Sequence, residues 1–265
     1  MPKAKVNDIQ MYYEVKGEGF PFVMVMGLGG NLDWWSPRLI EGLSKNFKTV
    51  VFDNRGAGRT DLSDKEYTIK LFADDIAGLM DALRISRAHV LGGSMGGMIA
   101  QELAINYPEK VEKLVLCSTN CGRTRSISAS QETLNSMLRA GSVSSAEERA
   151  RIVVPLGCTE DFIDHNAEGI ELMIRQMLKA PTSPETFQRQ ARAIMSFDAY
   201  DRLARIKAPT LVLCGKKDIL VPPENGSILA KAIPNAKLVY FEKSAHMLVE
   251  EMGEMIHTVT EFLLA

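Results

Sequence analysis

The sequence feature that most constrains the fold is an alternation of short, mainly apolar segments with longer segments that have helical spacing. The apolar segments lie at 21–26, 48–53, 88–93, 111–118, 209–215 and 236–242. The segments with helical spacing lie at 69–83, 95–108, 223–232 and 253–264. A run that is apolar at every position is typical of a strand buried on both faces. The alternation therefore predicts an α/β fold with a parallel sheet covered by helices on both faces, after an N-terminal hairpin at 6–15.

Residues 121–197 do not follow this alternation. They contain helical segments such as 132–140 and 169–180, which are broken by Gly141, Pro155, Pro181 and Pro184, and no segment typical of a strand. A chain of 265 residues is long enough for one domain with an insertion. We therefore predict an α/β core formed by 1–120 and 198–265, and an all-helical insertion formed by 121–197.

Composition limits the partners and cofactors of the chain. Its formal net charge of −2 gives no overall field that would attract nucleic acid or acidic membranes. No apolar run approaches the length of a membrane span, and the first residues contain no apolar signal core, so we expect a cytoplasmic protein. The four cysteines form no CxxC pair and have no histidines at zinc-ligand spacing, which favours buried apolar roles and no metal. A monomer and a homodimer both remain open.

The segment LGGSMGGMIA at 91–100 contains the pattern G-x-S-x-G, with Ser94 at its centre. The pattern alone is weak evidence, but Ser94 falls between a predicted strand and a predicted helix, as a nucleophilic serine on a sharp turn requires. Gly92 and Gly96 flank the serine where the helix and strand approach each other, and we expect Gly93 and Gly97 to relieve further crowding. The amide of Met95, at the start of the helix, is placed to face negative charge beside the serine.

A nucleophilic serine needs a base and an orienting carboxylate. His246 follows the predicted strand 236–242, and a loop after a parallel strand opens at the same sheet edge as Ser94. Asp218 follows the strand 209–215 at that edge. Asp53 also ends a strand and is the alternative carboxylate, although its segment, DNRGAGRT, is more typical of a loop held by backbone turns and an Arg55 contact. His89, His165 and His257 are interpreted as structural or solvated.

The order Ser94, Asp218, His246 resembles that of the α/β-hydrolase superfamily. The segments MGLGGNLDWW, DNRGAGRT, GKKDILVPP and SAHMLVEE are similar to its oxyanion loop, its DxRGxGxS segment, and its acid and histidine loops. The resemblance implies a helical cap at 121–197, a Ser94–Asp218–His246 triad and an oxyanion hole formed by the backbone amides of Leu28 and Met95. Met26 stands where many members have a histidine, so the hydrogen bonds of that histidine are missing from this loop.

The resemblance implies a serine hydrolase without a cofactor that acts on a small-molecule acyl ester through an acyl-enzyme on Ser94. We expect a carboxylesterase for small to medium acyl groups. Hydrolysis of an enol-lactone, an acyl thioester or a carbon–carbon bond, and cofactor-free perhydrolysis, are alternatives that share the triad. A small-molecule sensor that retains the triad is an alternative of another class.

Several residues border the predicted triad in sequence and are candidates for substrate binding. Leu220, Val221, Met247 and Trp34 are suited to an apolar acyl chain, although each is equally typical of core packing. Arg123 and Arg125 follow the strand at 111–118, where basic groups would attract an anionic leaving group such as a nucleotide thioester. Solvated surface charge is the simpler interpretation of both arginines.

Overall fold

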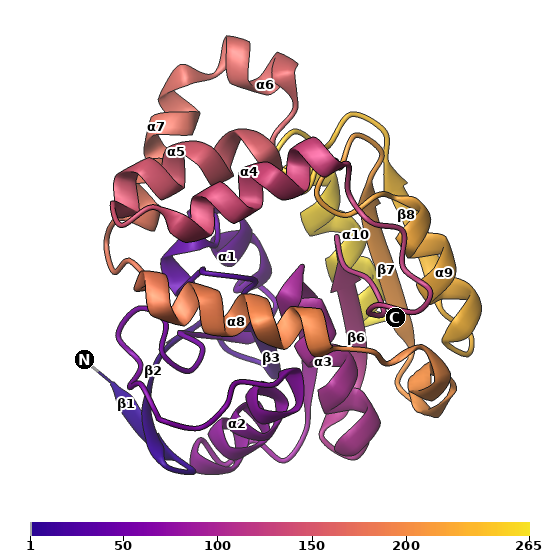
Figure 1. The fold of residues 1–265 in the computed structure, drawn as a ribbon. Helices are drawn as coiled ribbons and strands as arrows, with labels where there is room; N and C mark the ends of the chain where they lie inside the picture. Colours follow the sequence, from indigo (N-terminus) through magenta and orange to yellow (C-terminus); the bar gives the residue numbers. More distant parts are fainter. Residues whose placement is uncertain (1) are drawn as a thin grey trace.

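An eight-stranded sheet lies at the centre of the computed structural model, which describes residues 2–265 (Figure 1). Its strands are β1 (Lys3–Val6), β2 (Ile9–Lys16), β3 (Phe20–Val25), β4 (Phe47–Phe52), β5 (Ala88–Gly93), β6 (Val111–Cys117), β7 (Thr210–Gly215) and β8 (Lys237–Phe241). Neighbouring strands follow the order β1-β2-β4-β3-β5-β6-β7-β8. The pairs β1–β2 and β2–β4 are antiparallel, and the other pairs are parallel. The predicted α/β architecture is confirmed.

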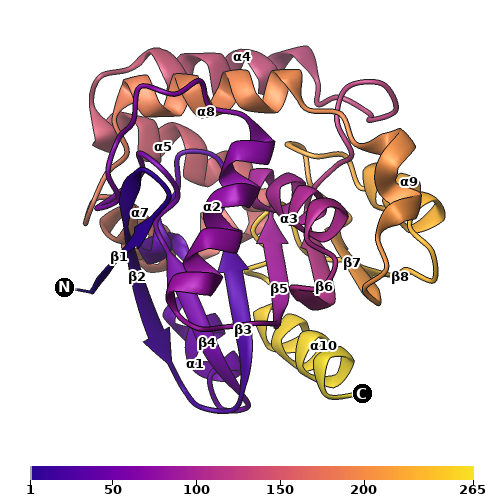
Figure 2. The ribbon, with the colours of Figure 1, turned by 90° about the horizontal axis from the view of Figure 1, so that it is seen from below.

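Helices cover both faces of this sheet (Figure 2). One face carries α2 (Ile69–Ala82), α3 (Met95–Asn106) and α9 (Glu224–Ala232), and the other carries α1 (Pro37–Leu43) and α10 (Met252–Leu264). Side chains that alternate along a strand reach opposite faces. In β3, Val23 and Val25 therefore pack toward α2 and α3, whereas Phe22 and Met24 pack toward α1 and α10. Burial on both faces explains why β3 is apolar throughout and why β5 and β7 are mainly apolar.

Between β6 and β7 the chain forms five helices, which we call the helical insertion (residues 121–197). They are α4 (Gln131–Ser142), α5 (Ala146–Gly157), α6 (Glu160–His165), α7 (Ala167–Met177) and α8 (Pro184–Ser196). Four of these helices are preceded by an N-cap residue whose side-chain hydroxyl accepts a hydrogen bond from the backbone amide of the third helical residue. These N-cap residues are Ser130, Ser145, Thr159 and Ser183. Gly122 pairs with Asp198 in an isolated antiparallel bridge, so both ends of the insertion lie side by side. The exact division between core and insertion stays a prediction.

Two residues that were expected to break helices lie inside them instead. Gly141 is in α4, and Pro155 is in α5, whose last residue is Gly157. Proline at this position cannot donate to the carbonyl four residues earlier, that of Arg151, so α5 contains Pro155 at the cost of one intrahelical hydrogen bond. Helix α1 was not anticipated, because seven residues are too few to establish a helical period.

The four cysteines are free and buried, as expected of small apolar side chains. Burial raises the pKa of the Cys117 thiol to about 12, and it does the same for Cys158 and Cys214. Such thiols remain protonated near neutral pH and are poor nucleophiles. Separately, no helix within residues 2–265 combines the length and apolarity that crossing a membrane requires.

The turn between β5 and α3 depends on close packing at specific glycines. A Cβ atom on Gly96 would lie 2.0 Å from the carbonyl oxygen of Val25 in β3, and one on Gly92 would lie 2.2 Å from the carbonyl oxygen of Gly96. A Cβ on Gly97 would lie 2.5 Å from Thr119. The expectation for Gly93 is wrong, because a Cβ there would meet only the Trp35 ring at 3.5 Å, an ordinary contact.

His89 lies in β5 at the end away from Ser94 and is a core residue, as interpreted from the sequence. Its side chain is buried between Phe20 and Phe47, with ring centroids at 4.7 and 5.8 Å. Burial lowers the pKa of His89 to about 4. By contrast, His165 and His257 are largely exposed, with 77% and 69% of their side chains accessible.

We expect Gly96→Ala and Gly93→Ala to differ sharply in stability. The added methyl of Gly96→Ala overlaps backbone atoms that cannot rotate away, so it should lower the free energy of unfolding by about 3 kcal/mol or more. Gly93→Ala should stay within about 1 kcal/mol of the parent. Urea unfolding of both variants measures this, and equal losses would contradict the assigned close contacts.

We expect the buried neutral imidazole of His89 to destabilise the protein at acid pH. Its pKa is 6.5 in the unfolded chain and about 4 in the fold, so between these values the unfolded chain binds the extra proton. Stability contributed by neutral His89 is present above pH 6.5 and is lost toward pH 4, by about 3 kcal/mol. The free energy of unfolding of His89→Phe should therefore rise relative to the parent as the pH falls. A difference between the two proteins that is the same at pH 7 and pH 4.5 would contradict this prediction.

Candidate active site

Ser94 occupies a strained turn at the carboxyl end of β5. Its backbone has φ 54° and ψ −122°, outside the regions that side-chain-bearing residues favour, which costs on the order of 1–3 kcal/mol. The turn is held by two hydrogen bonds: the Ser94 amide donates to the Cys117 carbonyl at 2.9 Å, and the Thr119 hydroxyl donates to the Ser94 carbonyl at 2.7 Å. The side chain is half-buried. This geometry fixes a partly accessible hydroxyl at the edge of the sheet.

The structure brings Asp218 and His246 together, as the sequence predicted. The Asp218 Oδ2 atom lies 2.8 Å from His246 Nδ1, and the two side chains are 1% and 12% exposed. The other carboxylate oxygen, Oδ1, accepts the backbone amides of Leu220 and Val221, each at 2.8 Å. An ionised carboxylate only accepts hydrogen bonds, so Nδ1 must carry the proton that it shares with Asp218. The second ring nitrogen, Nε2, is thereby left as the basic one.

The loop that carries His246 is held by the two glutamates that follow it. Glu251 accepts the amide of Lys243 at 2.9 Å and the hydroxyl of Ser244 at 2.7 Å. Glu250 accepts the amide of Thr159, at the start of α6, at 2.8 Å. The histidine loop is thus fixed both to itself and to the helical insertion.

No hydrogen bond joins the Ser94 hydroxyl to the His246 ring anywhere in residues 2–265. The two residues follow strands of the same sheet at the same edge, with β6 and β7 between β5 and β8. Hydrogen bonds between nucleophile and base are often long in proteins without substrate. The Ser94–His246 contact therefore stays a prediction, whereas the Asp218–His246 contact is present.

The loop after β3 lies directly against Ser94. A Cβ on Gly27 would lie 3.1 Å from the Ser94 Cβ and 3.6 Å from the Met95 amide nitrogen. The Gly30 amide donates to the Gly27 carbonyl at 3.2 Å, which closes a four-residue turn around Leu28. Within residues 2–265, neither the Leu28 amide nor the Met95 amide donates a hydrogen bond to another residue. Both amides are therefore free to donate, and the oxyanion hole that the family resemblance implies at Leu28 and Met95 stays a prediction.

This loop is held by two side chains from distant parts of the chain. The Asn54 side chain donates to the Met26 carbonyl at 2.9 Å. Gln190, in α8, accepts the Gly29 amide at 2.8 Å. Sequence reasoning did not identify Gln190, because nothing in the local sequence connects it to a loop 161 residues away.

Asp53, the alternative carboxylate, has a structural role. It is fully buried, and its two oxygens accept the amides of Leu32 and Arg59, each at 2.8 Å. Burial raises its pKa, although these donors and the Arg59 guanidinium oppose that rise. The expected Arg55 contact is also present: Arg55 is fully buried and donates to Asp75 at 2.6 and 2.7 Å.

The four apolar candidates for substrate binding are all half-buried around these loops. Leu220 and Val221 contribute the amides that hold Asp218. The Met247 amide donates to the Gly157 carbonyl at 2.9 Å, and its side chain packs against the insertion. Trp34 packs against the same apolar cluster of the insertion.

Arg123 and Arg125 are exposed. The Arg125 guanidinium stacks over the Tyr200 ring at 5.3 Å. No contact in the described part of the chain links either arginine to Ser94, Asp218 or His246. The structure gives the anionic-substrate interpretation no support.

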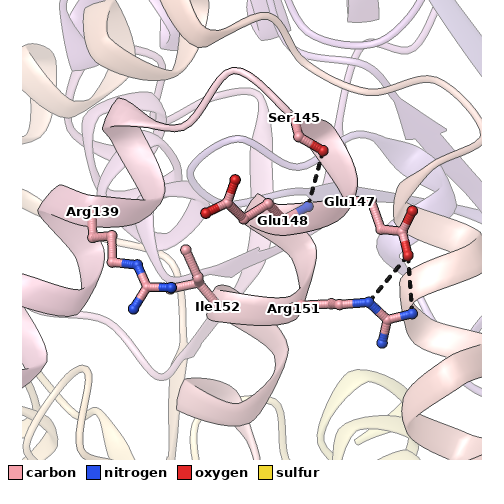
Figure 3. Close-up of a pocket in the computed structure, with 6 residues that line it drawn as sticks. All are labelled: Arg139, Ser145, Glu147, Glu148, Arg151 and Ile152. Carbon is pink, nitrogen blue, oxygen red and sulfur yellow. Dashed lines mark hydrogen bonds and ion pairs between the residues drawn. The ribbon is translucent and has the colours of Figure 1, made fainter.

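A hollow of about 450 Å³ lies on the outer surface of the insertion and is separate from this site (Figure 3). Two of its four charged lining residues, Arg151 and Glu147, form an ion pair, and Arg151 also contacts Glu171 outside the lining. Among residues 2–265, no group of three or more histidine, cysteine, aspartate or glutamate side chains is arranged to hold a metal ion.

Comparisons with known proteins agree with this geometry. A family model described as alpha/beta hydrolase fold matches residues 21–252. A putative carbamate hydrolase, RutD, from Azorhizobium caulinodans is 30% identical over 246 residues, which cover 93% of this chain and 91% of that protein.

Solved structures also resemble the chain along its full length. The enol-lactonase from Burkholderia xenovorans LB400 superposes with a TM-score of 0.88, at 29% identity and 100% coverage of both chains. A thermophilic esterase from Thermogutta terrifontis superposes with a TM-score of 0.84, at 27% identity, covering 99% of this chain and 97% of that one. With the family model matching most of its length, the chain belongs to the α/β-hydrolase fold family and is a hydrolase of that family.

Proposed function

We propose that this protein is a carboxylesterase that cleaves small to medium acyl esters through an acyl-enzyme on Ser94. The observation that carries the proposal is the Asp218–His246 pair at the edge of the sheet where Ser94 is held on its strained turn. A carboxylate that fixes the protonated Nδ1 leaves Nε2 free to accept a proton from a hydroxyl.

The reaction proceeds in two halves. His246 Nε2 takes the Ser94 proton as Oγ bonds to the acyl carbonyl carbon, and the amides of Leu28 and Met95 stabilise the negative oxygen. The tetrahedral species collapses, and His246 passes its proton to the departing alcohol. Water then attacks the acyl group with His246 as base, which releases the acid and restores the Ser94 hydroxyl. Asp218 stabilises the positive imidazolium throughout.

The acyl chain would lie among Leu220, Val221, Met247 and Trp34. Their half-buried apolar surfaces border the catalytic loops and the insertion, which supports an apolar acyl group.

Enol-lactone hydrolysis is a second candidate, favoured by the full-length likeness to the Burkholderia xenovorans enol-lactonase. A lactone is a cyclic ester, so the same nucleophile, base and oxyanion donors would open it. Some relatives are named putative carbamate hydrolases, and a carbamate carbonyl is open to attack by the same nucleophile. Esters, lactones and carbamates differ in their leaving groups and in the pocket shape they require, so these two properties determine which substrate is hydrolysed fastest.

Substitution of Ser94 tests the nucleophile. Ser94→Ala should abolish hydrolysis of p-nitrophenyl butyrate and covalent labelling by a fluorophosphonate probe. Ser118→Ala is a matched control, because Ser118 also follows a strand of the sheet with positive φ, 47°; it should keep activity within a few-fold. Parental turnover by Ser94→Ala would refute the proposed mechanism.

Asp218→Asn should lower kcat by about 10⁴-fold, as the equivalent change does in serine proteases. The asparagine amide would donate to the histidine and favour the wrong tautomer. The decrease should occur without loss of thermal stability. A decrease below 10-fold would show that Asp218 does not orient the base.

A substrate panel distinguishes the proposed functions. The parent should be assayed on p-nitrophenyl esters from acetyl to dodecanoyl, an enol-lactone, an acyl thioester and an alkyl carbamate. We expect the highest kcat/KM on a short or medium ester. A higher kcat/KM on the lactone would replace the first proposal with the second, and tight binding of every compound without turnover would favour the sensor.

A further inference from the structure

Helix α8 of the insertion contacts the oxyanion loop through two side chains one helical turn apart. Gln190 Oε1 accepts the Gly29 amide at 2.8 Å, and the Gln190 side chain is fully buried. The Phe187 ring covers the same glycine so closely that a Cβ on Gly29 would lie 2.7 Å from the ring. One face of α8 therefore holds the backbone of Gly29.

The turn at residues 27–30 has two possible arrangements of its central peptide. The Gly30 amide bonds to the Gly27 carbonyl, and Gly29 has φ +70°, which is the pattern of a type II turn. In a type I turn the peptide between the second and third residues is flipped over. That peptide carries the Gly29 N–H, which Gln190 accepts. The hydrogen bond from α8 therefore opposes the flip.

Orientation of the Leu28 amide depends on this turn. The Leu28 N–H and the Gly27 carbonyl belong to the same peptide plane and point in opposite directions. With the Gly27 carbonyl bonded inside the turn, the Leu28 N–H must face away from the turn. A flip of the next peptide changes ψ of Leu28 and leaves this N–H in place. The Leu28 amide depends instead on the two anchored groups on either side of it, the Met26 carbonyl bonded by Asn54 and the Gly29 amide bonded by Gln190. Without the second anchor the whole turn is free to shift and to carry the Leu28 amide with it.

We propose that Gln190 is a positioning residue, which acts through Gly29 to keep the Leu28 amide aimed at the oxyanion. Gln190 itself touches no reacting atom. This inference rests on the proposed function, because it assigns a role in stabilising the tetrahedral intermediate. It also makes the helical insertion part of the catalytic machinery as well as a wall of the substrate site.

Stability alone does not account for glutamine at this position. Its Nε2 atom is buried and has no hydrogen-bond partner among residues 2–265. An unpaired buried donor costs about 1–3 kcal/mol, roughly as much as the hydrogen bond to Gly29 contributes. The helix itself is anchored independently, because the buried Arg149 guanidinium lies 5.5 Å over the Phe187 ring and donates to the Thr182 carbonyl at 2.7 Å.

The test compares Gln190→Met with Gln188→Met. Methionine keeps the side-chain length and removes the acceptor. Gln188 is a matched control on the same helix: it is exposed and donates only to Gly141, inside the insertion, at 3.3 Å. We expect Gln190→Met to lower kcat for p-nitrophenyl butyrate by about 10- to 100-fold, less than complete loss of an oxyanion donor. The KM should change by less than about twofold, and Gln188→Met should match the parent.

A transition-state analogue separates positioning from a merely structural role. A trifluoromethyl ketone forms a tetrahedral oxyanion on the serine, so its Ki should rise by the same factor as kcat falls. The Ki of the product acid, butyrate, should not change. An unchanged kcat and trifluoromethyl ketone Ki in folded Gln190→Met would overturn the inference, as would equal changes in the Ki of both inhibitors.

Two further measurements keep failures apart. If Gln190→Met does not fold, hydrogen exchange of the Gly29 amide is measured in the parent protein instead. Exchange that is at least about 100-fold slower than in a free chain supports the inference, and exchange at the free-chain rate overturns it. Ser94→Ala distinguishes the two proposals. Activity retained in Ser94→Ala rejects the proposed function itself, whereas loss in Ser94→Ala with normal Gln190→Met rejects only the role of Gln190.

Discussion

The close approach of backbone to backbone beneath Ser94 is the constraint on which the site depends. Helix α3 lies against β3 and β5 because Gly92 and Gly96 have no side chains, and a single methyl at Gly96 would overlap the Val25 carbonyl. This contact lets the chain turn from strand to helix within one residue and forces Ser94 into a strained conformation. It also places the loop after β3 next to the serine, so one packing constraint positions both the hydroxyl and its neighbouring amides.

The parallel order of the strands brings the other candidate catalytic side chains to the same edge of the sheet. Strands β5, β7 and β8 end at one edge of the sheet, and the loop after each carries Ser94, Asp218 or His246. Asp218 is almost fully buried, a state that is unfavourable for a carboxylate without partners. Two backbone amides and the histidine ring occupy its oxygens. The same contacts that make its burial tolerable also fix the tautomer of His246. The arrangement that stabilises the buried carboxylate is therefore also the one that leaves Nε2 as the base.

These strands and their order along the chain were predictable because each is rich in apolar residues and each is followed by a helical segment. The Asp218–His246 contact was predictable because parallel strands present their carboxyl ends together. Other features had no local signal. Gly93 belongs to the same glycine cluster as Gly96 in the sequence. Only the structure shows that a Cβ atom at Gly93 has room, because its one close neighbour is the Trp35 ring at 3.5 Å. Pro155 lies inside α5 although proline disfavours a helix interior, so tertiary context overrides local propensity there.

Gln190 shows most clearly why sequence alone fell short. A single hydrogen bond spans 161 residues and joins the oxyanion loop to α8. Asn54 holds the start of that loop from the core, at the Met26 carbonyl, whereas Gln190 holds its centre from the insertion. The loop is therefore rigid only while the insertion sits on the core. Sequence changes in α8 would then alter the rate of the chemical step as well as the choice of substrate, because the same helix limits the site and orients its amides.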